Sequence, residues 1–356
     1  MMILKEQGIE YKIIPNSLIA TIRFNLKGRK ELHSVINELS QSIPQEYILG
    51  PAFCIYHFVS SVKEGFDVEV GFPISHTVET GEIKTRMLPQ IEVLSMIHEG
   101  TVEKIGESTR KLYSHATEQG VVSDEFSREV FIDSNNPVGK KVELQFIIHN
   151  WNQLLAKNLE RVLGEEKKQE IMQENNQLSL DSPLDERVQW LRRVMESLDK
   201  LATEDQKYDI LSSCAHVFPS EPIEKARKIY ENIEEQTKDP LKAIDAVIEF
   251  MEKDPAWPKP PFRSGNIIYS SKMPRDPKKY EEATNESEKR KAYCFCPLVR
   301  NHLDKGVPKT FCYCGAGWYR RQWEGTIGKP VRIEIVKSIL NGDDLCKFAI
   351  YLPEDL

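Results

Sequence analysis

The chain has 356 residues, which is too long for one ordinary core and predicts two or three domains. Its 40% hydrophobic and 29% charged residues are typical of a globular protein in water. No apolar run approaches the roughly 20 residues needed to span a bilayer. A net charge of −7 argues against general nucleic-acid binding, so we expect neither a membrane nor a nucleic-acid partner.

The N-terminus carries no apolar stretch before a small-residue cleavage site, so we expect no secretory signal and a cytoplasmic location. In a reducing compartment, clustered cysteines favour metal binding or catalysis over disulfides.

Residues 1–150 are predicted to mix strands and helices. Alternating or continuous apolar runs indicate strands over 11–14, 18–26, 52–59, 66–74, 82–88, 91–98, 127–133 and 142–149. Apolar residues at helical spacing indicate helices near 32–39 and 102–115. The order is strand, helix, strands, and then again strands, helix, strands. This order predicts two similar halves in an α+β domain with an antiparallel sheet.

The middle of the chain is predicted to be helical. Residues 151–182 are expected to form a helix followed by a loose polar linker over 168–182. Residues 183–356 are expected to form a helical and cysteine-rich α+β domain. Within it, Thr203-Glu-Asp-Gln206 is a capping-box pattern, and the polar stretch 274–291 is expected to be a loop. A final strand is expected from Cys346 to Leu352.

The first 150 residues resemble the GyrI-like small-molecule-binding domain, which also serves as the effector-binding domain of some AraC- and MerR-type regulators. The stretches that carry the resemblance are GPAFCIYHF, FDVEVGFPI, GEIKTRMLP, VLSMIHEGTVEKIG, SREVFID and VELQFII. The resemblance implies a pocket between the two halves that holds small, often cationic or aromatic, ligands, with an acidic residue inside it. No DNA-binding module is expected beside this domain.

Glu129, in Ser-Arg-Glu-Val-Phe, matches the pocket glutamate of that family. A buried carboxylate either meets a cation or binds its proton more tightly, which suits ligand recognition or acid catalysis. Phe131 stands where the family often has Tyr and would leave an aromatic wall without a hydroxyl. Tyr56 and Trp151 are aromatic candidates for ligand contact, with core packing as the favoured alternative. Glu69 either lines the pocket or faces solvent, and solvent is slightly favoured.

Two Cys-x-Cys pairs lie near the C-terminus, Cys294/Cys296 and Cys312/Cys314. Four thiolates can hold a tetrahedral Zn²⁺ or, as an alternative, an iron–sulfur cluster. One residue between paired cysteines is less usual for zinc than two or more, and free cysteines are often simply buried. Further ligand candidates are His302 and the pair Cys214 and His216, although a surface histidine is the favoured reading of the first.

The end of the chain, from CYCGAGWYRRQW to LCKFAIYLP, resembles the four-vinyl-reductase domain. The matching residues are Cys314, Gly342, Asp343, Cys346 and Phe348. In zinc-binding relatives another cysteine stands eight residues before the last one, and here that position is Ser338. The resemblance therefore implies an altered site in which Cys314 and Cys346 are joined by Cys294, Cys296 or Cys312. Residues 185–356 also look like an uncharacterised bacterial family.

The functional expectation is a stand-alone sensor. Its N-terminal domain would bind a small hydrophobic or cationic molecule, and its cysteine-rich module would bind a metal or a second ligand. The alternative is a hydrolase of small reactive molecules with Glu129 as general acid/base. A metal-dependent scaffold is a third reading, and a homo-oligomer is an open expectation.

Overall fold

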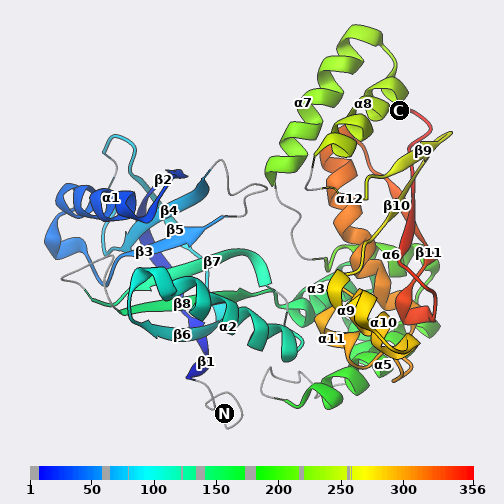
Figure 1. Ribbon diagram of the computed structural model, residues 1–356, viewed down its shortest axis with the longest axis horizontal. Helices are drawn as coiled ribbons and strands as arrows, with labels where there is room; N and C mark the ends of the chain where they lie inside the picture. The colour runs from blue at the N-terminus through cyan, green and yellow to red at the C-terminus, as the bar shows by residue number, and fades with distance from the viewer. Residues whose placement is uncertain are drawn as a thin grey trace. The chain divides into compact units, whose positions relative to one another are not determined.

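The computed structural model describes residues 8–57, 65–78, 80–121, 123–133, 141–172, 182–215, 220–254, 257 and 259–356. The chain divides into two compact units, Met1–His149 and Asn150–Leu356, and each is described by itself (Figure 1). The fold class is α+β, as the sequence predicted. Within the described residues, no helix combines the length and the apolar character that crossing a bilayer requires.

The N-terminal unit is built on one eight-stranded antiparallel sheet. Its strands are β1 (Ile9–Ile14), β2 (Ser17–Leu26), β3 (Phe53–Tyr56), β4 (Phe66–Pro73), β5 (Lys84–Leu88), β6 (Ile91–Glu99), β7 (Ser123–Phe131) and β8 (Lys141–Ile148). Its helices are α1 (Arg29–Ser42) and α2 (Ile105–Glu118), with short 3₁₀ turns η2 (Gln45–Tyr47) and η4 (Val102–Lys104).

The strand order is β1-β6-β8-β7-β3-β4-β2-β5. If β1 is exchanged with β5, β2 with β6, β3 with β7 and β4 with β8, the result is the same order read from the other edge of the sheet. The two halves of the sequence are therefore the two halves of the sheet, as expected from the repeated element order. They meet where β3 pairs with β7, at the middle of the sheet.

Both helices cover one face of this sheet. The buried stripe of α1, formed by Leu32, Ile36 and Leu39, packs over β2 and β4. Helix α2 packs over β6 and β8. Apolar residues at three- and four-residue spacing produce these stripes, and packing on the sheet removes them from water.

The second unit contains a helical array and a four-stranded sheet of order β11-β12-β10-β9. Its longer helices are α3 (Trp151–Leu163), α4 (Glu165–Met172), α5 (Leu184–Leu201), α6 (Glu204–Ser212), α7 (Ser220–Thr237), α8 (Pro240–Lys253) and α12 (Tyr313–Ile327). Shorter ones are α9 (Pro277–Glu282), α10 (Glu286–Tyr293), α11 (Pro297–Arg300), η5 (Lys309–Cys312) and η6 (Ile339–Asn341). The strands are β9 (Phe262–Ser264), β10 (Ile267–Ser271), β11 (Arg332–Lys337) and β12 (Lys347–Tyr351).

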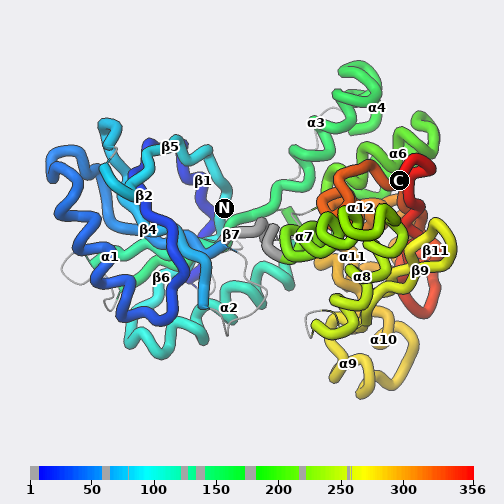
Figure 2. Tube along the Cα trace, turned by 90° about the horizontal axis from the view of Figure 1, so that it is seen from above, coloured from blue at the N-terminus to red at the C-terminus, as the bar shows by residue number. Residues whose placement is uncertain are grey.

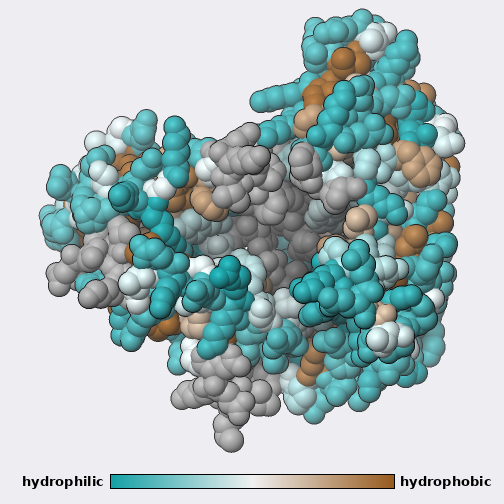
Figure 3. Space-filling model, viewed as in Figure 1, coloured by the Kyte–Doolittle hydropathy of each residue, from teal (hydrophilic) through white to brown (hydrophobic). Residues whose placement is uncertain are grey.

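Two apolar clusters hold the second unit together. One joins α3, α4, α5 and α6 to the cysteine-bearing segments, and the other joins α7, α8 and α12 to the sheet. In Figure 1, α7 and α8 lie side by side as a hairpin, which agrees with their packing. The face seen in Figure 3 is mostly hydrophilic, and hydrophobic side chains occur there as small patches, one of them on this hairpin. The capping box at Thr203 is present, with both reciprocal hydrogen bonds formed.

Two segments differ from the sequence prediction. The expected linker 168–182 begins inside α4, whose Ile171 is fully buried, and residues 173–181 lie outside the described part. The expected loop 274–291 contains α9 and most of α10, which lie together in Figure 2. Asp276 and Asn285 cap these helices through their side chains. The high charge of this segment suggested a loop, but the capping residues fit helix starts.

Candidate functional site

Glu129 is the centre of a buried polar network in the N-terminal unit. It lies on β7, directly opposite Cys54 of β3, and is 7% exposed. One carboxylate oxygen forms an ion pair with the Arg29 guanidinium, and the other accepts a hydrogen bond from the Tyr56 hydroxyl at 3.2 Å. The carboxylate thus meets a cation, which is the outcome that makes burial of its charge tolerable.

The protonation of Tyr56 and Arg29 follows from this network. Burial and then the Glu129 carboxylate raise the pKa of Tyr56 well above its usual value, so the phenol stays protonated and donates. Burial alone would lower the pKa of Arg29, but the charge of Glu129, its hydrogen bond and the nearby Tyr56 and Cys54 together outweigh burial and raise the pKa. Arg29 is therefore a permanent cation beside Glu129.

Aromatic side chains share the helix-covered face with Glu129. Tyr56 makes an edge contact with Phe66, the two ring centroids being 6.1 Å apart. On the other side of β7, Tyr113 of α2 makes an edge contact with Phe146 of β8 at 4.8 Å. Tyr113 also hydrogen-bonds Ser127, which lies two residues before Glu129 and so on the same face.

Glu69 lies on the opposite face of the sheet. It pairs with Ile55, the neighbour of Cys54 on β3, and adjacent strand residues point to opposite faces. The favoured expectation that Glu69 faces solvent is wrong, because its residue exposure is only 6%. Its carboxylate accepts hydrogen bonds from Thr21 and Arg86. Glu69 therefore belongs to a separate polar cluster and not to the Glu129 network.

The two remaining aromatic candidates pack in cores. Phe131 is 2% exposed on β7, on the same face as Glu129. Trp151 begins α3 in the second unit, where its ring makes an edge contact with Phe311 at 5.4 Å. Packing in the second unit's core is the alternative that the sequence favoured for Trp151.

Arg29 is a member of the Glu129 network that no sequence motif indicated. It is the first residue of α1, where a cation is disfavoured by the partial positive charge of the helix N-terminus. That local mismatch was the one available signal. Its partner is one hundred positions away, and only the fold brings the two together.

Six of the seven cysteines lie in the second unit, and their thiols are neighbours. Burial raises the pKa of the Cys312 thiol, and a hydrogen bond with Ser338 lowers it in part. The charges of Cys346, Cys294 and Cys296 raise it further. The Cys314 sulfur lies 3.7 Å from the Cys214 carbonyl oxygen. Burial and the Cys314 charge raise the pKa of Cys296 to about 11.

The altered metal site that the resemblance implied, built on Cys314 and Cys346, stays a prediction. Ser338, at the position of the missing ligand, caps η6 and lies 3.1 Å from the Cys312 sulfur. Across the residues that the structure describes, no three His, Cys, Asp or Glu side chains form a group that could hold a metal ion. His302 instead pairs with Asp185 at 3.1 Å, and His216 lies outside the described residues.

The arrangement predicts poor thiol reactivity. Burial raises the pKa of Cys314 to about 11 and of Cys294 to about 12, so little thiolate exists at neutral pH. At pH 7.5, alkylation of Cys294, Cys296 and Cys314 by iodoacetamide should be at least about 100-fold slower in the folded protein than in urea. Peptide mass spectrometry measures each site. One cysteine reacting at its unfolded rate, or a rise in rate with chelator together with zinc or iron in elemental analysis, would contradict this interpretation.

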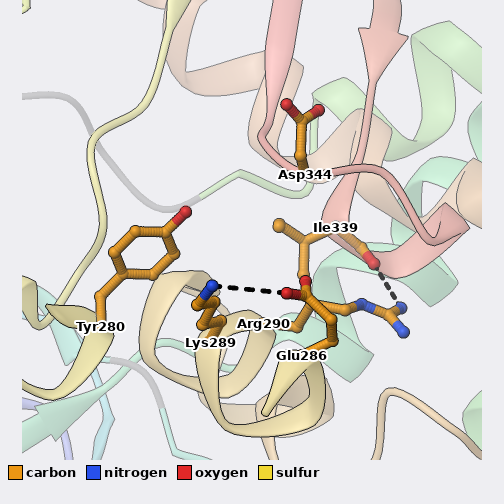
Figure 4. A pocket seen from close by; sticks show the side chains of 6 residues that line it. All are labelled: Tyr280, Glu286, Lys289, Arg290, Ile339 and Asp344. Carbon is orange, nitrogen blue, oxygen red and sulfur yellow. Dashed lines mark hydrogen bonds and ion pairs between the residues drawn. The ribbon is translucent and has the colours of Figure 1, made fainter. Parts of the chain in front are cut away.

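The second unit also has a small pocket of about 200 Å³ (Figure 4). It is lined by Tyr280, Glu286, Lys289, Arg290, Ile339 and Asp344. Lys289 pairs with Glu286 at 3.4 Å, and Arg290 donates to the Ile339 carbonyl oxygen at 2.7 Å. Asp344 pairs with Lys337 at 2.9 Å. Each charged side chain that lines this pocket thus has at least one partner in the chain.

Comparisons with known proteins cover different parts of the chain. Residues 284–356, which include both Cys-x-Cys pairs, match a family of unknown function, DUF6144. That match spans less than half of the chain. No curated protein matches the sequence.

Several solved structures are similar over about two fifths of this chain. The EcmrR C-terminal domain is 19% identical, with 39% of this chain and 96% of that chain covered and a TM-score of 0.35. A hydrolase encoded by lin2189 from Listeria innocua is 12% identical, with 40% and 91% covered and a TM-score of 0.30. SAV2435 bound to tetraphenylphosphonium is 9% identical, with 41% and 96% covered and a TM-score of 0.31. At these values the similarity assigns no function, and the candidate site rests on its own contacts.

Proposed function

We propose that the N-terminal unit binds small organic cations that carry aromatic groups, and that Glu129 recognises their charge. The observation that carries this proposal is a buried carboxylate whose ionic partner is a cation, at the junction of two similar halves. Aromatic rings on the same face add the attraction of a cation for a ring face. In a low-dielectric setting these terms favour a positive ligand over a neutral one of the same shape.

Tetraphenylphosphonium is a suitable probe, because its charge is permanent and its shape is aromatic. SAV2435 was solved with this cation bound, which makes it a reasonable first choice. Calorimetric titration of the full-length protein measures its affinity without a label.

Glu129→Gln should weaken tetraphenylphosphonium binding by at least about tenfold, because the amide keeps the size of the side chain but loses its charge. Asp67→Asn is the control, since it removes an exposed carboxylate of the opposite face. Circular dichroism checks that both variants fold. No binding to the wild type, or equal affinity of wild type and Glu129→Gln, would defeat the proposal.

The hydrolase alternative keeps Glu129 but asks it to transfer protons. The described neighbours of its carboxylate are a guanidinium that stays charged and a phenol that stays protonated. These contacts suit charge recognition more than proton transfer. Binding without turnover is therefore the function that the geometry supports best.

A further inference from the structure

Arg29 holds the place beside Glu129 that a cationic ligand would take. Its guanidinium pairs with the carboxylate through Nη2, while Nη1 is buried and has no hydrogen-bond partner among the described residues. With this pair formed, the charge of Glu129 is already compensated. A ligand cation can then reach the carboxylate only in exchange for Arg29.

The two members of the pair differ in their access to water. The Arg29 side chain is 27% exposed, whereas the Glu129 side chain is 9% exposed. Arg29 begins α1 behind Gly28, which supplies no side-chain cap to the helix and has open space around it. Arg29 is therefore the more water-accessible member of the pair, and Glu129 lies on the central strand β7.

From this arrangement we propose that Arg29 is an internal competitor for Glu129 and sets the specificity of the site. The inference rests on the proposed function and deepens it. The site binds a cation in exchange for the guanidinium, so affinity is reduced by the fraction of molecules in which Arg29 occupies the carboxylate. Cations that bring enough aromatic surface to displace Arg29 bind, and small hydrated cations do not.

The test compares two probes of one shape and opposite charge, tetraphenylphosphonium and tetraphenylborate, by calorimetric titration. Arg29→Met should raise the affinity for tetraphenylphosphonium about tenfold, because the competitor is gone. The same variant should not gain affinity for tetraphenylborate. Lys30→Met is the matched control, since it makes the same charge change at the next, exposed residue of α1. Lys30→Met should leave the affinities for both probes within about twofold of the wild-type values, because exposed charges are screened.

A double variant separates competition from a structural role. If Arg29 acts through Glu129, the gain from Arg29→Met disappears in the Glu129→Gln background. Should Arg29→Met fail to fold, this double variant, which leaves no unpaired charge in the network, is compared with Glu129→Gln alone. Equal affinities support the inference, and a gain of about tenfold in the double variant overturns it.

The failure of this inference differs from the failure of the proposed function. If Arg29→Met leaves tetraphenylphosphonium affinity unchanged or lowers it, while Glu129→Gln still weakens binding, Arg29 is not a competitor and Glu129 remains the binding group. Tighter binding of tetraphenylborate than of tetraphenylphosphonium to the wild type, lost in Arg29→Met, would make Arg29 an anion-binding residue and overturn both.

Discussion

Replacing Glu69 by glutamine is expected to lower the free energy of unfolding of the N-terminal unit by about 3 kcal/mol at neutral pH. The Glu69 carboxylate accepts hydrogen bonds from Thr21 at 2.7 Å and from Arg86 at 2.7 and 3.0 Å, and His57 lies 3.5 Å away. Hydrogen bonds to charged groups contribute about 1.5–3 kcal/mol each. Their sum is discounted here, because the Arg86 side chain is 41% exposed and regains water when the carboxylate is lost.

The Glu69 effect should depend on pH with a definite sign. Burial alone would raise the pKa of Glu69, but the neighbouring His57 and the hydrogen bonds from Arg86 and Thr21 hold it well below its usual range. Because the folded-state pKa is depressed, the stabilisation is present above the unfolded-state value of about 4.3 and is lost as the pH falls through the folded-state value. The stability difference between wild type and Glu69→Gln should therefore shrink below about pH 4.

Hydrogen exchange of peptides from β2 and β4 measures the loss of stability in Glu69→Gln within the N-terminal unit, without a contribution from the second unit. Asp67→Asn is the matched control, because Asp67 lies two residues earlier on the same strand and face. The ion pair of Asp67 with Arg23 is exposed, so Asp67→Asn should lower the free energy of unfolding by less than about 1 kcal/mol. Equal losses in the two variants, or a difference that does not change with pH, would show that the buried charge of Glu69 is not the cause.

Gly317→Ala is expected to destabilise the second unit by about 3 kcal/mol. Gly317 lies in α12 where this helix passes the end of α6. A Cβ atom there would overlap the Ser212 carbonyl oxygen, and would lie 2.7 Å from the carbonyl carbon and 2.8 Å from the Ala215 Cβ. These are backbone and short side-chain atoms that cannot rotate away, so one helix must move.

The control for Gly317 lies in the same helix. A Cβ at Gly315 would be 3.7 Å from the Phe348 ring, which is ordinary contact. Gly315→Ala should therefore be neutral or stabilise by up to about 1 kcal/mol, because alanine favours helix. All five tryptophans lie in the second unit, so urea unfolding followed by their fluorescence reports on that unit alone. If Gly317→Ala unfolded at the same urea concentration as Gly315→Ala, the result would contradict the close packing of α12 against α6 at Gly317.

Local pattern predicted much of the N-terminal unit. Alternating apolar residues indicated β4 and β8, and helical spacing indicated α1 and α2, because each element buries one regular stripe. The alternation on β4 also suggested a solvent-facing side for Glu69. That expectation failed because side chains on both faces of β4 are buried, and partners from β2, β5 and the end of β3 satisfy the charge.

The cysteine motif shows the limit of spacing as evidence. The sequence alone established two Cys-x-Cys pairs and a further cysteine near the end of the chain. Whether such thiols converge depends on how η5, α12 and the turn before β12 pack, which spacing does not encode. In the fold, Cys312 meets Ser338 and Cys314 meets the Cys214 carbonyl, and the thiols of this unit form no metal-holding group within the described residues.

The sequence by itself determined the α+β class, the repeated halves and, through resemblance, the choice of Glu129. These follow from local periodicity and motif. Only the tertiary structure decided what Glu129 contacts, because Arg29 and Tyr56 are 100 and 73 positions away from it. A charge can be buried only where the fold brings it a partner, and that pairing is a property of the packed sheet and helix together.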